Sequence, residues 1–536
     1  MKRFVTVIVI LSSFLFPVSS SASSEAEILK RIDELTKEMK KMDDVKKELE
    51  TLKKQVDDLK KKDTAQEKKI KDVEKIAKKA EGISRFELWG EYRFKADSIH
   101  ANFDRFTGYK WNSNVTMGGA AIGAFQPKQY EEFTASDNSL LTNRLRLKFK
   151  VKATEDVDFT GRLAMYKIWG QQTPAPLATN YGEPYGFMPQ NATLFDGNTS
   201  YKPADSALKV DRAFMNWYEP WGFPGIISVG RRPSAGGSPL HLKQGIERDA
   251  TPVGLGVDYA MDGLAVIYTP DIEALPGFKA RLCYGKGFES GLRDSNVNTL
   301  KDATFAGFNF DIYENRETGT LAQINLYRAF NLNDLPEKAT ANIGDVNHAT
   351  ALFMTKAAGV DWFASAGLSK TYPKNVSDWR PRVDMNSDGD VDDTGDTTMS
   401  PGGLLYDEGG NKKSRTGHAI HLGTRIPYGK SKFGLEYNYG SKYWVNFTPA
   451  SDDIYGSKLA TKGHVGELYW LYDLTKKPVW KLSKVLFRLG YQHYIFNYSG
   501  SGLLLGEPKK LSGNPSLLYP SPRTMDNVYA SFDVHF

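Results

Sequence analysis

The sequence has almost no cysteine and no long hydrophobic run beyond its first 20 residues. Its single cysteine, Cys283, excludes a disulfide framework, a four-cysteine zinc site and a cysteine-ligated iron–sulfur cluster. The chain also lacks the C-x-x-C-H motif that attaches haem covalently. Without a helix-length apolar run, any crossing of a membrane must use strands. The G-x-S-x-G, H-E-x-x-H and P-loop motifs are absent, and we predict no enzymatic activity.

The first 22 residues predict a secretory signal peptide. Lys2 and Arg3 precede an apolar run over residues 4–16, and small residues follow, with Ser20 and Ala22 before the expected cleavage site. The alternative is an uncleaved membrane anchor. No cysteine follows the apolar run, so lipoprotein processing is not expected. The mature chain is therefore predicted to be exported.

Residues 25–80 predict an α-helical coiled coil. They contain 18 basic and 15 acidic residues, with no glycine and no proline, and apolar residues recur at alternating spacings of four and three. One extra three-residue step and a polar stretch at Asp63 and Gln66 interrupt this heptad pattern. A narrow apolar stripe needs a partner to cover it, so we expect self-association, with a trimer favoured over a dimer.

From residue 84 onward the hydrophobic period changes to two, as in β-strands. In the second predicted strand, Leu145, Leu147 and Phe149 alternate with basic residues. Such alternation persists for more than 400 residues without a helical segment to cover the apolar faces. A membrane barrel needs this arrangement, because one face meets lipid and the other meets a watery interior. The fold class predicted for residues 84–536 is therefore an all-β, transmembrane antiparallel β-barrel.

The connections between the predicted strands alternate between short and long. Short ones at 154–156, 314–317 and 427–430 contrast with long ones near 98–142, 170–207, 233–252, 371–413, 444–462 and 499–523. If the segments 253–269 and 348–370 are both split into hairpins, the chain has 17 strands. Bacterial single-chain barrels have an even number, so one assignment is wrong. We favour 16 strands, with 18 as the alternative; either size leaves room for an aqueous channel.

The C-terminus carries the most specific single signal. Every second residue from Val528 to Phe536 is apolar and the chain ends on phenylalanine, while Asn527, Ser531 and Asp533 lie in the opposite set. This ladder resembles the terminal signature of outer-membrane barrels.

Four segments, 142–147, 159–167, 210–214 and 228–233, resemble a family of Gram-negative outer-membrane porins known as a domain of unknown function. The resemblance covers roughly residues 84–536 and implies a barrel and a channel role. It supplies no catalytic or ligand-binding residues to carry over.

Seven basic residues are candidates for the pore lining, because rings of arginine or lysine in a narrow pore favour anions. They are Arg144, Arg146, Lys148, Lys150, Arg162, Arg231 and Arg232. The alternative is that they pair with acidic residues such as Glu91 and Asp158 on neighbouring strands. Outside the signal peptide and the coiled coil the sequence has 50 basic and 49 acidic residues, so the composition gives no overall preference for anions.

One long loop contains the start of a calcium-binding motif. Asp384, Asn386, Asp388, Asp390 and Asp392 offer oxygen ligands, and Gly389 stands at the sharp turn of such loops. The acidic residue usual at the twelfth position is replaced by Gly395, and flanking EF-hand helices are absent from the pattern. We expect calcium to bind here, with an acidic surface loop that holds divalent ions loosely as the alternative.

These features predict a porin-like channel in the outer membrane of a Gram-negative bacterium, which passes small hydrophilic solutes or ions by passive diffusion. The expected partners are outer-membrane lipid, lipopolysaccharide and further copies of the chain, with peptidoglycan contact through the coiled coil; no nucleic-acid partner and no obligatory cofactor is expected. Two alternatives are a structural tether that acts through the coiled coil and a barrel that surrounds a partner cytochrome.

Overall fold

The computed structural model divides the chain into two compact units, Met1–Glu87 and Leu88–Phe536. It describes residues 85–170, 203, 206–335, 339–379, 382–394, 396–398, 402–406, 411–448, 453–478, 483–517 and 520–536, and eight positions between 32 and 51. The predicted signal peptide lies outside these residues. So does the predicted coiled coil, except for the eight positions, all of which are helical. No helix in the described part of the chain is both long and apolar enough to span a membrane.

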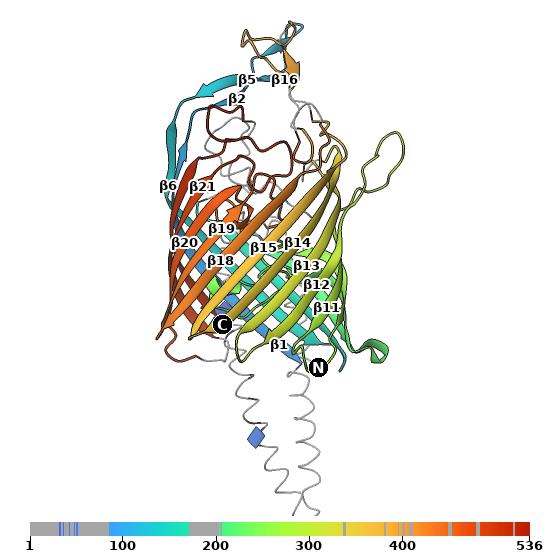
Figure 1. Cartoon of the computed structure of the whole chain (residues 1–536), viewed down its shortest axis with the longest axis vertical. Helices are drawn as coiled ribbons and strands as arrows, with labels where there is room; N and C mark the ends of the chain where they lie inside the picture. Colours follow the sequence, from blue (N-terminus) through green and yellow to red (C-terminus); the bar gives the residue numbers. More distant parts are fainter. Residues whose placement is uncertain are drawn as a thin grey trace, which may run out of the picture. The chain divides into compact units, whose positions relative to one another are not determined.

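Sixteen strands in the described residues close into an antiparallel barrel. Figure 1 shows the barrel from the side. The predicted fold class and the favoured strand number are thus confirmed. The wall strands are β1 (Phe86–Phe103), β6 (Phe133–Lys152), β7 (Val157–Ile168), β8 (Lys209–Tyr218), β9 (Gly225–Arg232), β10 (Met261–Tyr268), β11 (Lys279–Phe288), β12 (Ala303–Asn315), β13 (Thr320–Asn333), β14 (Asn342–Ala357), β15 (Val360–Pro373), β18 (Thr416–Tyr428), β19 (Ser431–Gly440), β20 (Gly463–Asp473), β21 (Lys484–Phe496) and β22 (Thr524–His535).

The alternation in the sequence becomes the two faces of the wall. On β22, Val528 and Phe532 are 49% and 47% exposed on the outer face, whereas Asn527 and Asp533 are buried on the inner face at 2% and 0%. The same pattern places Leu264, Phe353 and Leu468 on the outside of other strands. An apolar outer face and a polar inner face are what a barrel in lipid requires.

Strand β1 closes the ring by pairing with β22. Tyr92 lies opposite Val534 and Phe94 opposite Phe532, in an antiparallel register that runs to Asn102 and Thr524. The backbones of Gly90 and Phe536 exchange two further hydrogen bonds, of 2.7 and 3.0 Å. The terminal phenylalanine thus takes part in the seam itself.

Short and long connections lie at opposite ends of the barrel. Connections such as 153–156, 316–319, 358–359 and 429–430 form the turn end. The long connections form the loop end, where β2 (Phe106–Asn112), β5 (Ala124–Tyr130), β16 (Arg382–Val383) and β17 (Thr397–Thr398) build a separate small sheet (Figure 1). A two-stranded sheet of β3 (Thr116–Met117) and β4 (Ala120–Ala121) completes this end.

The predicted hairpin at 253–269 is wrong, whereas the one at 348–370 corresponds to β14 and β15. Only Met261–Tyr268 is a wall strand, β10. Val253, Leu255 and Val257 are buried, because this stretch belongs to a loop that packs against the inner wall. The apolar residues alternate in the sequence as in a wall strand, but the backbone turns here, since the amides of Gly256 and Val257 donate to the carbonyl of Val253. This error accounts for the seventeenth strand.

Aromatic rings lie over several glycines on directly opposite strand positions. Tyr529 covers Gly490, Tyr469 covers Gly434, and in each pair an added Cβ would lie within 2.2 Å of the ring. The missing side chain of the glycine leaves the space that the ring fills.

We predict that Gly490→Ala destabilises the barrel by about 1–3 kcal/mol, because the added methyl group displaces the buried Tyr529 ring, whose hydroxyl donates to Glu467. The matched control is Gly466→Ala on β20, where the added Cβ meets open space. The measurement is urea unfolding of the folded protein in detergent. Equal midpoints for the two variants would contradict this packing.

Candidate functional site

The loop between β9 and β10, residues 233–260, crosses the interior of the barrel. Asp249 contacts Arg162 on β7, Lys243 contacts Glu467 on β20, and the backbone carbonyl of Thr251 accepts a hydrogen bond from Gln323 on β13. These three wall strands lie five or six strands apart around the ring. A segment that touches three such positions must span the lumen, and we call it the crossing loop.

The crossing loop contains a short helix, α4 (His241–Gln244), whose contacts hold the loop in place. The helix ends at Gly245, whose φ of 68° lies in the left-handed region that favours glycine. A Cβ there would also lie 2.7 Å from the side chain of Leu471 on the inner wall. Arg425 on β18 donates to the carbonyl oxygen of Leu242 at 2.9 Å, which holds the same helix from another direction.

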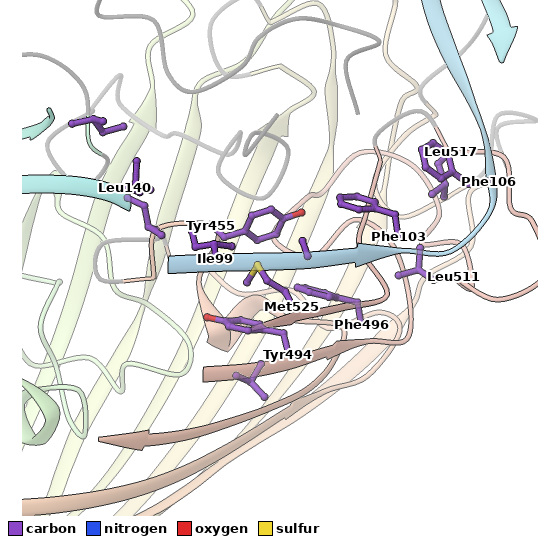
Figure 2. Close-up of a cluster of buried hydrophobic side chains, with 14 residues drawn as sticks. Ile99, Phe103, Phe106, Leu140, Tyr455, Tyr494, Phe496, Leu511, Leu517 and Met525 are labelled. Carbon is purple, nitrogen blue, oxygen red and sulfur yellow. The ribbon is translucent and has the colours of Figure 1, made fainter. Parts of the chain in front are cut away.

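Loops fill much of the interior with apolar side chains. In Figure 2, Tyr455, Leu511 and Leu517 from two loops gather with Ile99 and Phe496 of the wall strands in one buried cluster. Two further clusters join the crossing loop and other loops to inner-wall residues of β12–β15. Burial of this apolar surface holds the loops inside the barrel in the same way that a core holds a soluble protein.

A buried charge cluster fixes loops to the wall at β19 and β20. Lys458, on the loop before β20, contacts both Glu436 and Glu467, and Lys243 of the crossing loop lies 2.6 Å from Glu467. Burial would lower the pKa of Lys458, but Glu436, Glu467 and Asp453 raise it well above its usual value. Lys458 is therefore charged at neutral pH.

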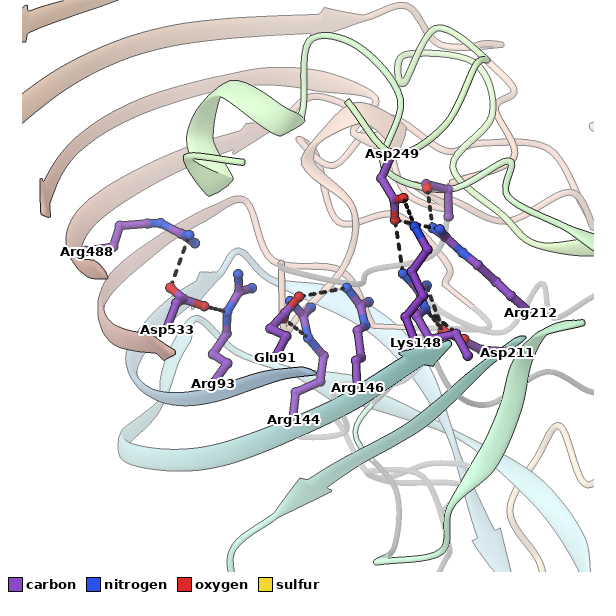
Figure 3. A network of polar contacts seen from close by, with 12 residues as sticks. Glu91, Arg93, Arg144, Arg146, Lys148, Asp211, Arg212, Asp249, Arg488 and Asp533 are labelled. Carbon is purple, nitrogen blue, oxygen red and sulfur yellow. Dashed lines mark hydrogen bonds and ion pairs between the residues drawn. The ribbon is translucent and has the colours of Figure 1, made fainter. Parts of the chain in front are cut away.

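The basic residues of β6 lie on the inner face, four and five strands from β20 and β19 around the ring, as part of a network that we call the basic wall (Figure 3). Glu91 accepts from Arg144 at 2.5 Å, and Arg146 lies 3.8 Å from the other oxygen of Glu91. Lys148 pairs with Asp249 at 3.1 Å, and Lys150 pairs with Asp158 at 2.9 Å. The side chains of Lys148 and Lys150 are nevertheless 35% and 33% exposed to the interior.

Asp211 and Arg212 join the basic wall through a β-bulge. The register between β7 and β8 shifts after Arg162, which lies opposite Arg212, while Leu163 lies opposite Val210. The extra residue, Asp211, turns inward and receives Arg162 at 2.7 Å. Without the bulge its carboxylate would face the apolar outside.

Asp249 of the crossing loop accepts from three cations of the basic wall. Arg212, Lys148 and Arg162 lie 2.5, 3.1 and 3.2 Å from its carboxylate. Partial burial would raise the pKa of Asp249, but these three cations hold it well below its ordinary value. The crossing loop is thus fixed to the basic wall by a carboxylate that stays charged.

The two predicted arginines at the end of β9 face opposite ways. Arg232 points inward and donates to Ser228 at 2.8 Å. Arg231 lies opposite Asp262 on the outer face, 3.7 Å from its carboxylate and two positions along the strands from the exposed pair Val229 and Leu264. Neighbouring residues of a strand point to opposite faces, so Arg231 does not line the interior as predicted.

The acidic loop segment 384–394 is organised by hydrogen bonds from its own backbone and from Gln126 and Gly118. Asp384, which is fully buried, accepts from the amides of Ser387 and Gly389 and from the side chain of Gln126. Asp392 accepts from the amide of Gly118, and Asn386 donates to Asp388 and Asp393.

Three carboxylates of this segment come together. Oxygens of Asp388, Asp390 and Asp393 lie within 4.8 Å of one another. The hydrogen bond to Asp396, with the charges of Asp396 and Asp388, raises the pKa of Asp393 to about 6. Asp393 was not among the predicted ligands, because it lies outside the spacing of the motif.

The fold is a closed antiparallel barrel of sixteen strands within the described residues. Solved structures with a similar fold include OmpF of Salmonella typhi in complex with daunomycin, which is 10% identical, with 84% of this chain and 97% of that chain covered and a TM-score of 0.39. The in-vitro folded trimer form of OmpT, an outer membrane protein of Vibrio cholerae, is 9% identical, with 84% and 99% covered and a TM-score of 0.36.

Residues 134–536 match the family described as a protein of unknown function, DUF3373. The chain belongs to this family. No curated protein matches it.

We predict that Lys458→Met lowers the free energy of unfolding by about 3–5 kcal/mol, because it leaves two buried carboxylates, Glu436 and Glu467, without their shared cation. Lys286→Met is the control, since its partners Glu289 and Asp302 are solvent-accessible and such pairs contribute at most about 1 kcal/mol. Denaturant unfolding of both variants measures the difference. An equal effect in the two would show that the buried cluster does not hold the loops.

Proposed function

We propose that this chain is an outer-membrane channel that passes small hydrophilic solutes or ions passively along its basic wall. One observation supports this most directly: Lys148 and Lys150 keep a third of their side-chain surface accessible inside a barrel whose loop end is packed with loops. Water-accessible charge on the inner face of a closed barrel serves passage of polar solutes. Asp249 borders the same accessible region. The crossing loop would determine the width of the passage. No catalytic step forms part of this proposal.

The proposal includes a place in the cell. The signal peptide at 1–22 would direct export, the turn end would face the periplasm, and the loop end would meet lipopolysaccharide outside. Residues 25–80 would join protomers, with a trimer favoured, and would extend toward peptidoglycan.

A structural tether is the second candidate function. The three apolar clusters in the interior favour it, because loops packed in this way can close a barrel to solutes. Conductance of the purified protein would argue against a tether. If the protein is a channel, a variant without residues 25–80 should still conduct.

We predict that the channel closes partly when a bulky group is attached at the basic wall. In a Cys283→Ser background, Lys148→Cys should conduct in a planar bilayer, and a thiol-reactive reagent should lower its single-channel conductance, because the added group occupies the passage. Val229→Cys, on the outer face, is the matched control and should not respond. Folded protein that never conducts would overturn the channel proposal.

We propose in addition that the acidic segment binds calcium through Asp388, Asp390 and Asp393. Carboxylate oxygens at such separations can share one ion, and extracellular calcium sites commonly bind with Kd on the order of 10⁻⁴–10⁻³ M.

Titration calorimetry with calcium tests this second proposal. The intact chain should release or absorb binding heat, and a double variant, Asp388→Asn with Asp390→Asn, should lose it. Asp271→Asn, an exposed acid near the turn end, should bind like the intact chain. Unchanged binding in the double variant would place any calcium elsewhere.

A further inference from the structure

Arg146 is the least satisfied cation of the basic wall. Its side chain is 11% exposed, and the carboxylate of Glu91 lies 3.8 Å away, beyond hydrogen-bond length. Glu91 is already bound to Arg144, whose Nη2 and Nε lie 2.5 and 3.1 Å from one of its oxygens. Opposite Arg146 on β7 lies Ala164, which offers no acceptor side chain. The Nε of Arg146 has no hydrogen-bond partner in the part of the chain that the structure describes.

The surroundings of Arg146 carry an excess of positive charge. Three carboxylates of the basic wall each lie beside two or more cations: Asp533 pairs with Arg93 and Arg488, Glu91 has Arg144 and Arg146 within 4 Å, and Asp249 pairs with three cations. The described network in Figure 3 contains seven basic and four acidic residues, an excess of three positive charges. The Nε atoms of Arg212 and Arg488 also have no partner there. Buried cations in such excess favour an added anion.

The chemistry of the wall indicates which anion. A guanidinium presents a planar fork of donors that matches two oxygens of a carboxylate or phosphate. Asp249 shows this preference within the chain, because its carboxylate is held by Lys148, Arg162 and Arg212. Figure 3 places Arg146 between this group and the Glu91 pair. The neighbouring Lys148, with 35% of its side chain exposed, gives a solute access to the same place.

We propose that Arg146 and Lys148 form a binding site for small oxyanions, carboxylates or phosphate, and that this site makes the channel select them. The inference rests on the proposed channel function and names the class of solute. The bound anion takes the donors that Glu91 leaves free on Arg146, beside the carboxylate of Asp249.

Ion currents through purified protein in a planar bilayer test the proposal. The reversal potential in a potassium chloride gradient should show anion preference, and added inorganic phosphate or acetate should reduce the chloride current. Arg146→Gln should raise the half-blocking phosphate concentration about tenfold or more, as expected for the loss of a charge-assisted pair. Arg146→Lys keeps the charge but not the planar fork of donors, so its half-blocking phosphate concentration should lie between those of the unchanged chain and the glutamine variant. It replaces the glutamine variant as the test if that variant fails to fold.

Arg231→Gln is the matched control, since it removes the same charge from the outer face of the barrel. Phosphate should block the current through this variant at the same concentration as through the unchanged chain. Separate measurements with phosphate and with acetate distinguish the two types of oxyanion. If both anions reduce the current, the site binds oxyanions in general. A channel without anion preference, or equal block in the Arg146 and Arg231 variants, would overturn the inference while leaving the channel function intact.

If the protein does not conduct, calorimetry of phosphate binding to the folded chain decides the matter separately. Binding heat that Arg146→Gln removes and Arg231→Gln keeps would support the site, and its absence from the unchanged chain would overturn it.

Discussion

The structure depends on closing a sheet so that no strand keeps an unpaired edge. In lipid, backbone groups find no water to bond, so every strand needs two neighbours. The seam between β1 and β22 meets this constraint, and its last contacts come from the terminal residue, Phe536, with Gly90. Once the ring is closed, the period-two alternation assigns each side chain to the outer face or to the interior, and all further chemistry follows from that assignment.

The interior combines two kinds of interaction at different places. Apolar clusters hold the loops as a soluble core would, two of them toward the loop end and one that reaches Leu321 and Met354 near the turn end. At wall strands β6–β8 and β19–β20, charge pairs hold the crossing loop, with Asp249 bound to the basic wall and Lys243 bound to Glu467. The crossing loop therefore carries the charge complementary to each wall that it meets. This explains why a charged interior coexists with a well-packed one.

Much of the fold could be predicted from the sequence, because strand alternation is a local property. The barrel, its turn and loop ends and the two faces of β22 follow from it. The segment 253–260 could not be told from a wall strand, since apolar residues occupy every second position of both sequences, although all of residues 253–260 are buried in the loop. Arg231 could have been assigned correctly, because adjacent strand residues cannot both face inward. Asp211 and Asp249 could not, because a bulge and a loop path that no local pattern specifies bring them to the basic wall.

The central claim is that neighbouring residues of the wall face lipid and water in turn. Spin labels at Val528 and Lys148, with the protein in a lipid bilayer, test it through their accessibility to oxygen and to a water-soluble nickel complex. Oxygen, which concentrates in lipid, should broaden the label at position 528, and nickel should broaden the label at position 148. Equal access of the nickel complex to both positions would contradict the account.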